Sequence, residues 1–232
     1  MADDDELLAE QSRFYAARAP EYDEWWQRSG RYDRGDDDRR EWQAQVDVVE
    51  TRLAAFGATG DVLEIAGGTG WWTERLARTA DRLTVVDASP ETLALNRERV
   101  GRADVEYVVA DVFDWQPARR YDVVFFSFWL SHVPRERFSA FWQLVRTCLA
   151  PDGRAFLIDN RDGPRPTPDV KDPVVVEYQP DLHIRRLSDG SQWRVVKVMY
   201  DVDELQSLIA GQGWDVQLDG TRWFLFGSAR PQ

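Results

Sequence analysis

The chain has 232 residues, and its shares of 43% hydrophobic and 30% charged side chains are typical of a globular domain with a sizeable core. Its net charge of −12 and isoelectric point near 4.7 argue against a broad basic surface, so we expect no nucleic-acid partner. The single cysteine, Cys148, excludes an intrachain disulfide and a cysteine cluster, and we expect no metal. The acidic start is unlike a signal peptide and no apolar run reaches membrane-spanning length, so we expect a cytoplasmic protein without a membrane partner.

The amino-terminal part of the chain has a pattern of its own. Residues 1–41 are charged and are interrupted by proline and glycine, and we interpret them as a helical segment outside the main domain. Between 42 and 56 apolar residues recur at helical spacing, which predicts a helix that ends at Gly57.

An alternation of strands and helices begins after Gly57. Short apolar runs between turn residues predict buried strands at 61–66, 83–86, 105–109, 121–128 and 155–159. Helical patterns separate most of them, at 70–79, 90–100 and 134–149. Repeated strand–helix–strand units indicate a parallel sheet that is covered on both faces.

The remaining residues have a different pattern. The runs 182–187 and 192–200 flank Ser-Asp-Gly-Ser, which predicts a β-hairpin. Asp201 and Glu204 form a capping-box pattern for a helix to about residue 210. Two final runs, at 216–218 and 223–226, predict a closing antiparallel hairpin.

The turn after the first strand is rich in glycine, in the run Val62-Leu-Glu-Ile-Ala-Gly-Gly-Thr-Gly70. Such a turn lets a ligand approach the backbone where a helix N-terminus presents free N–H groups. The dinucleotide fingerprint GxGxxG is not matched and no phosphate-loop lysine is present after it. The turn alone is therefore a weak signal.

Acidic residues end the next two strands. Asp87 can accept hydrogen bonds from both ribose hydroxyls of a nucleoside that lies across the strand ends. Asp111, with Val112, can accept from an adenine amino group while a neighbouring N–H donates to a ring nitrogen. Each aspartate alone could be a turn cap. Both together, after the glycine turn, favour a nucleoside-containing ligand.

This series resembles the class I S-adenosylmethionine-dependent methyltransferases, in particular the bacterial small-molecule branch with the menaquinone- and ubiquinone-type enzymes. Glu64-Ile-Ala-Gly-Gly-Thr-Gly70 is similar to the family motif Glu-x-Gly-x-Gly-x-Gly. Ala66 replaces the first glycine, and we expect this one-methyl change to need no left-handed backbone. The run from Ala150 to Arg154 resembles the Pro-Gly-Gly turn before the fifth strand, and residues 14–23 resemble the quinone-type lid.

The resemblance implies an α/β, Rossmann-like class I methyltransferase fold with a mostly parallel seven-stranded sheet and a C-terminal antiparallel hairpin. It implies an N-terminal helical lid at 1–41, a cofactor-binding domain at 42–232 and a late β-hairpin insert at about 160–200. The implied cofactor is S-adenosylmethionine. Its expected binding residues are Tyr15, Glu64, Ala66, Gly67, Gly68, Gly70, Asp87, Ala88, Asp111, Val112 and Phe128.

His132 is the candidate catalytic residue. It lies after the fourth strand, and an unperturbed histidine pKa of about 6.5 suits a general base near neutral pH. The alternative is a histidine that caps a loop or packs under the lid. For His183 we expect a solvated or packing role. The candidate substrate-binding residues are Tyr22, Trp26, Trp129 and Asn160, with core packing or a turn as the competing interpretations.

The expected function is methyl transfer to a small-molecule acceptor, with a hydroxyl favoured. The Asp-Pro-Pro-Tyr-type signature is absent from the run 126–129, which disfavours a nucleic-acid base or a glutamine as acceptor. The alternatives are N- or C-methylation of a small molecule, or a non-catalytic module that binds S-adenosylmethionine. The sequence names neither the acceptor nor the oligomeric state.

Overall fold

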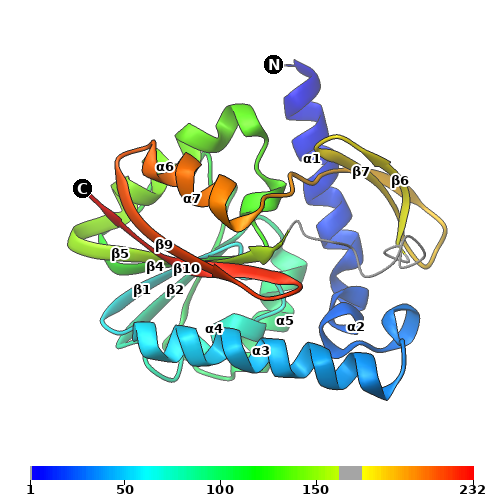
Figure 1. Cartoon of the computed structure of the whole chain (residues 1–232), viewed down its shortest axis with the longest axis horizontal. Coiled ribbons are helices and arrows are strands. Elements are labelled where there is room, and N and C mark those ends of the chain that lie inside the picture. Colours follow the sequence, from blue (N-terminus) through cyan, green and yellow to red (C-terminus); the bar gives the residue numbers. More distant parts are fainter. Residues whose placement is uncertain (1, 162–173) are drawn as a thin grey trace.

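The computed structural model of the chain describes residues 2–161 and 174–232 (Figure 1). Its α-helices are α1 (Ala2–Arg18), α2 (Tyr22–Gln27), α3 (Asp36–Phe56), α4 (Trp71–Leu76), α5 (Pro90–Val100), α6 (Phe138–Cys148) and α7 (Val202–Ala210). Short 3-10 helices are η1 (Ala19–Glu21), η2 (Gly30–Tyr32), η3 (Leu130–His132) and η4 (Arg135–Arg137). The strands are β1 (Asp61–Ile65), β2 (Arg82–Asp87), β3 (Glu106–Val109), β4 (Tyr121–Ser127), β5 (Leu149–Asn160), β6 (Val175–Gln179), β7 (Leu182–Arg186), β8 (Gln192–Val196), β9 (Trp214–Gly220) and β10 (Phe224–Pro231).

The main sheet has seven strands in the order β3-β2-β1-β4-β5-β10-β9. The first five of these are parallel neighbours. Strand β10 pairs antiparallel with β5, and β9 pairs antiparallel with β10. The predicted Rossmann-like fold with its closing antiparallel hairpin is confirmed. Because β1 to β4 are parallel, their carboxyl ends meet at one edge of the sheet, where such folds bind ligands.

Two hydrophobic cores cover the two faces of this sheet. Successive strand residues point to opposite faces, so Val62 joins the core under α3 and α4, while Leu63 joins the core under α6 and α7. Phe125 and Phe126 on β4 divide in the same way. Figure 1 shows α3 and α4 below the sheet and α6 and α7 above it.

The amino-terminal segment is packed into the main domain. Helix α3 begins at Asp36, so the lid boundary expected at residue 41 falls inside a helix. Trp26 and Trp42 share one buried cluster, and Trp42 Nε1 donates to the carbonyl of Trp26 at 3.0 Å. The first 35 residues therefore contribute side chains to the core as well as to the lid.

A second sheet of three strands, β6-β7-β8, carries the predicted hairpin. Strand β6 was not predicted from the sequence, because its second and third residues are both exposed and interrupt the alternation typical of a half-buried strand. The insert expected at about 160–200 falls partly on 162–173, which lies outside the described residues. Helix α1 runs beside this sheet (Figure 1), and Glu10 accepts from the backbone N–H of Arg194 at 2.6 Å.

Several element boundaries differ from the prediction. Strand β5 begins at Leu149 because a bulged register pairs it with Tyr121, so the preceding helix ends one residue earlier, at Cys148. The capping of α7 is confirmed, since Asp201 accepts from the backbone N–H of Glu204 at 2.8 Å. No helix in the described part of the chain has the length and apolar character needed to cross a membrane.

Candidate active site

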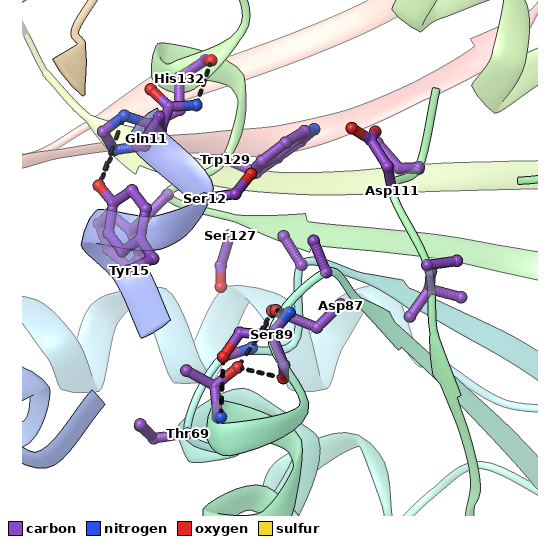
Figure 2. A pocket seen from close by; sticks show the side chains of 18 of the residues that line it. Gln11, Ser12, Tyr15, Thr69, Asp87, Ser89, Asp111, Ser127, Trp129 and His132 are labelled. Carbon is purple, nitrogen blue, oxygen red and sulfur yellow. Dashed lines mark hydrogen bonds between the residues drawn. The ribbon is translucent and has the colours of Figure 1, made fainter. Parts of the chain in front are cut away.

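A pocket lies at the carboxyl ends of β1 to β4, beside helix α1 (Figure 2). The sheet edge contributes loop residues, the lid contributes polar and aromatic side chains, and the segment after β4 closes the remaining side. These lining residues include Ala66, Gly68, Thr69, Asp87, Ala88, Ser89, Thr92, Asp111, Val112, Gln11, Ser12, Tyr15, Tyr22, Phe128, Trp129 and His132.

The glycine turn serves two purposes. Gly68 lines the pocket with a φ of 52° and has open space where a side chain would start. Gly70 has a φ of 91°, and an added Cβ would lie 2.8 Å from the side chain of Asn96, so glycine lets α5 pack closely here. Asn96 Nδ2 also donates to the carbonyl of Gly67 at 3.1 Å. Gly67 and Gly70 thus support the loop from beneath, outside the pocket lining.

Ala66 has a φ of 54°, which lies in the left-handed region. The expectation that alanine needs no left-handed conformation at this position is wrong. An L-residue with a Cβ pays about 1–2 kcal/mol there, so the family's glycine would be less strained. The backbone N–H of Ala66 donates to Val86 at 2.8 Å, and this bond to the neighbouring strand holds the turn in place.

Asp87 is half-buried in the pocket wall and is fixed by three donors. It accepts from the backbone N–H of Gly68 at 2.9 Å, from that of Ser89 at 2.9 Å and from Thr92 Oγ1 at 3.1 Å (Figure 2). Burial raises the pKa of its carboxyl above the usual value, although these donors oppose the shift. A carboxylate held in this way can take further hydrogen bonds from ligand hydroxyls, so the residues present fit a ribose.

Glu64 lies under the glycine turn and not in the pocket lining. Its side chain is buried, with 1% exposure, and its Oε2 has no hydrogen-bond partner among the described residues. Burial raises the pKa of Glu64 to about 8, opposed by a hydrogen bond from Thr73 and aided by the charge of Asp87. The carboxyl is therefore mainly neutral at pH 7 and lies beneath the turn, next to Gly67.

We expect Glu64→Gln to change how stability depends on pH. The folded pKa of about 8 exceeds the unfolded value of about 4.5, so the wild-type free energy of unfolding should fall between about pH 5 and pH 8. The glutamine variant cannot titrate and should lack this fall, which we put at roughly 2–4 kcal/mol. Thermal melts across this range measure it, with the exposed Glu98→Gln as control. Parallel melting curves for wild type and Glu64→Gln would contradict the assignment.

The opposite wall of the pocket carries Asp111, Val112 and Trp129. Asp111 is exposed and accepts from the backbone N–H of Phe113 at 2.9 Å, while Val112 is buried. The ring of Trp129 lies 6.3 Å from that of Phe113, and Figure 2 shows Trp129 beside Asp111. Trp129 therefore lines the pocket as expected, and its place at the acceptor stays a prediction.

His132 is buried between the lid and strand β8. Its Nδ1 lies 2.6 Å from the carbonyl oxygen of Val196, which can only accept, so Nδ1 carries the proton. Its Nε2 lies 2.7 Å from Tyr15 Oη and accepts from that hydroxyl (Figure 2). We expected His132 Nε2 to face the acceptor directly, but the hydroxyl of Tyr15 lies at this nitrogen.

The surroundings of His132 keep its ring neutral. Burial lowers the pKa of His132 well below the usual value of 6.5, and the positive charges of Lys197, Arg185 and Arg18 lower it further. A neutral ring with a protonated Nδ1 leaves Nε2 free to accept a proton.

Two hydrogen-bond groups hold the lid over the pocket. Asp23 on α2 accepts from Thr69 Oγ1 at 2.8 Å and forms an ion pair with Arg99. Gln11 Nε2 donates to the carbonyl of His132 at 3.1 Å, and Gln11 Oε1 accepts from the N–H of Val196 at 3.0 Å. Gln11 and Asp23 were not predicted from the sequence, because neither belongs to a local motif.

Two predicted substrate residues do not line the pocket. Trp26 is 4% exposed and stacks on Trp25 at a ring distance of 5.1 Å within the aromatic core. Of its two interpretations, substrate binding and core packing, the structure supports core packing. Asn160 ends β5, and its backbone N–H donates to Asp159 at 2.7 Å. Tyr22 and Tyr15, in contrast, are brought into the lining from the lid.

The chain is similar to known methyltransferases and to structures with a bound S-adenosyl ligand. A family model described as "Methyltransferase domain" matches residues 62–153. A structure of DhpI with S-adenosylhomocysteine (SAH) is 36% identical, covers 97% of both chains and has a TM-score of 0.79. A DhpI–SAM–HEP complex, in which SAM is S-adenosylmethionine, has the same identity and TM-score and is covered over 98% of its length.

Two further matches are partial or distant. Nodulation protein S of Rhizobium tropici is 31% identical over 112 residues, which are 47% of this chain and 46% of that protein. The chain thus spans about half the length of the curated relatives that it matches. The glycopeptide N-methyltransferase MtfA in complex with SAH is 17% identical with a TM-score of 0.58, covers 79% of this chain and 88% of its own, and shows a likeness of fold alone.

Proposed function

Because the chain belongs to the class I S-adenosylmethionine-dependent methyltransferases, with S-adenosylmethionine as methyl donor, we propose that it methylates an oxygen atom of a small molecule. The DhpI complex with SAM and HEP supports a small-molecule acceptor, since it pairs the methyl donor with a second ligand in a relative that this chain covers over 98% of its length. The net charge of −12 supports a small molecule over a nucleic acid. N- or C-methylation and a non-catalytic binding module are the alternatives.

The observation that carries the proposal is the Tyr15–His132 pair in the pocket wall. The donor supplies a methyl group on a positively charged sulfur, so the protein's main tasks are to align the reactants and to exclude water. An acceptor hydroxyl must also lose its proton. Tyr15 Oη can accept this proton while it passes its own to Nε2 of His132, 2.7 Å away. The hydrogen bond from Nδ1 to Val196 orients the ring for this transfer.

The experiment is a turnover assay with S-adenosylmethionine that carries a labelled methyl group. The protein is incubated with two matched panels of acceptors, one of hydroxyl compounds and one of the corresponding amines. Fractions of a cell extract are tested in the same way. We expect SAH to form together with a product whose label NMR places on oxygen. A label on nitrogen or carbon would support the alternative reactions. Tight SAH binding without turnover in any fraction would support a binding module.

A further inference from the structure

A cluster of three side chains joins helix α2 to the glycine turn. Thr69 lies between Gly68 and Gly70 in this turn, and it is only 3% exposed. Its Oγ1 donates to Asp23 on α2 at 2.8 Å, and Asp23 forms an ion pair with Arg99 on α5. Arg99 also donates to Thr69 Oγ1 at 3.4 Å, so each of the three side chains contacts the other two.

The backbone on both sides of Thr69 is flexible by residue type. Gly68 has a φ of 52° and Gly70 a φ of 91°, and glycine adopts such values as readily as many others. Contacts with the surroundings must therefore hold this part of the turn in place. The backbone N–H of Gly68, next to Thr69, donates to Asp87 Oδ2 at 2.9 Å. A shift of Thr69 therefore also shifts the N–H group that helps to fix Asp87 in the pocket wall.

Helix α2 is held by the core and not by the turn alone. Trp26 on this helix is 4% exposed and belongs to the same buried cluster as Val62 on β1. Trp25 packs beside it at a ring distance of 5.1 Å. These contacts keep α2 in place, so Asp23 on the same helix presents a fixed acceptor to the hydroxyl of Thr69.

The cluster is better suited to positioning than to stabilising the fold. The side chains of Asp23 and Arg99 are 30% and 23% exposed, and ion pairs that reach solvent contribute little to folding. A hydroxyl that donates to a carboxylate, in contrast, forms a charge-assisted bond with a defined direction. We therefore expect the hydrogen bond of Thr69 to fix the turn, while Arg99 holds the carboxylate of Asp23 toward it.

We propose that Asp23 is a positioning residue for the methyl donor, and that it acts through Thr69 to hold the glycine turn in the conformation that binds S-adenosylmethionine. Asp23 itself lies outside the pocket lining, while Thr69 belongs to it. A turn that adopts its binding conformation for only part of the time binds its ligand with an affinity reduced by that fraction. The proposal goes beyond the proposed function, because it concerns the affinity for the donor and holds for any acceptor.

The test is calorimetric titration of the full-length protein with SAH. Asp23→Ala and Thr69→Val each remove one partner of the hydrogen bond, and each is expected to weaken SAH binding by about 5- to 30-fold. Thr69→Ser keeps the hydroxyl and should bind SAH within about two-fold of wild type. Asp5→Ala is the control, because it removes an ion pair of α1 with Arg137 that involves neither α2 nor the glycine turn. Its SAH affinity should equal that of wild type.

A double variant distinguishes positioning from a general loosening of α2. Asp23→Ala combined with Thr69→Val should bind SAH within about two-fold of either single variant, because both substitutions remove the same hydrogen bond. Losses that multiply would overturn the proposal, since the two residues would then act separately. Wild-type SAH affinity in Asp23→Ala or in Thr69→Val would overturn it as well. If Asp23→Ala does not fold, Thr69→Val and Thr69→Ser decide the question, and equal SAH affinities of these two variants contradict the proposal.

Discussion

Asp87→Ala is expected to weaken SAH binding by about 10- to 150-fold, which corresponds to about 1.5–3 kcal/mol. The carboxylate lies at the carboxyl end of β2 in the pocket wall, where it can accept from ligand hydroxyls. Charge-assisted hydrogen bonds of this kind are worth more than neutral ones. The substitution also releases the N–H groups of Gly68 and Ser89, so part of the loss comes from a looser loop. Calorimetric titration with SAH measures the effect.

The matched control for Asp87→Ala is Asp81→Ala. Asp81 is exposed and precedes the amino end of the same strand, far from the pocket lining. SAH affinity should be unchanged in this variant, and both variants should keep the wild-type far-UV spectrum. If Asp87→Ala unfolds the protein, or if its folded fraction keeps wild-type SAH affinity, Asp87 is a structural turn cap and not a ligand for the ribose.

The cofactor end of the site could be predicted because its determinants are local. Strand ends are marked by the switch from apolar runs to turn residues, and Asp87 and Asp111 directly follow such runs. Parallel strands then bring these ends together without any further information. The order of alternating elements and the closing hairpin could be predicted for the same reason.

The backbone of the glycine turn and the faces of the lid were harder to predict. Alanine rarely adopts a left-handed backbone, so the residue type of Ala66 did not indicate its positive φ. Tyr22 and Trp26 lie on one short helix, and the aromatic pattern does not say which ring faces the pocket and which faces the core.

The acceptor end depends on contacts between distant parts of the chain. Tyr15 and His132 are 117 residues apart, and Gln11 and Val196 are 185 residues apart. Helix α1 packs against the second sheet, and this packing brings Gln11 and Tyr15 beside His132. No local pattern shows this arrangement. The sequence therefore predicted His132 as a candidate base but did not predict its hydrogen bond with Tyr15.

Tyr15→Phe and His132→Ala are each expected to lower the methylation rate of a hydroxyl acceptor by roughly 10²–10⁴-fold at saturating substrate. Both remove one member of the path by which the hydroxyl proton reaches Nε2. Since burial and three cations hold the pKa of His132 well below 6.5, the wild-type rate should stay constant near neutral pH. It should fall only at acidic pH, where the ring becomes protonated and can no longer accept the proton.

A comparison of these two variants separates proton transfer from support of the lid. His132 also binds the carbonyl of Val196 and, through its own carbonyl, Gln11, so His132→Ala alone could act by loosening α1. Tyr15→Phe leaves these two bonds in place and removes only the hydroxyl. The chain has two histidines, and His183→Ala serves as the control, because His183 packs against Tyr178 at a ring distance of 4.7 Å in the second sheet. A Tyr15→Phe rate within a few-fold of wild type would contradict the proposed path of the proton through Tyr15.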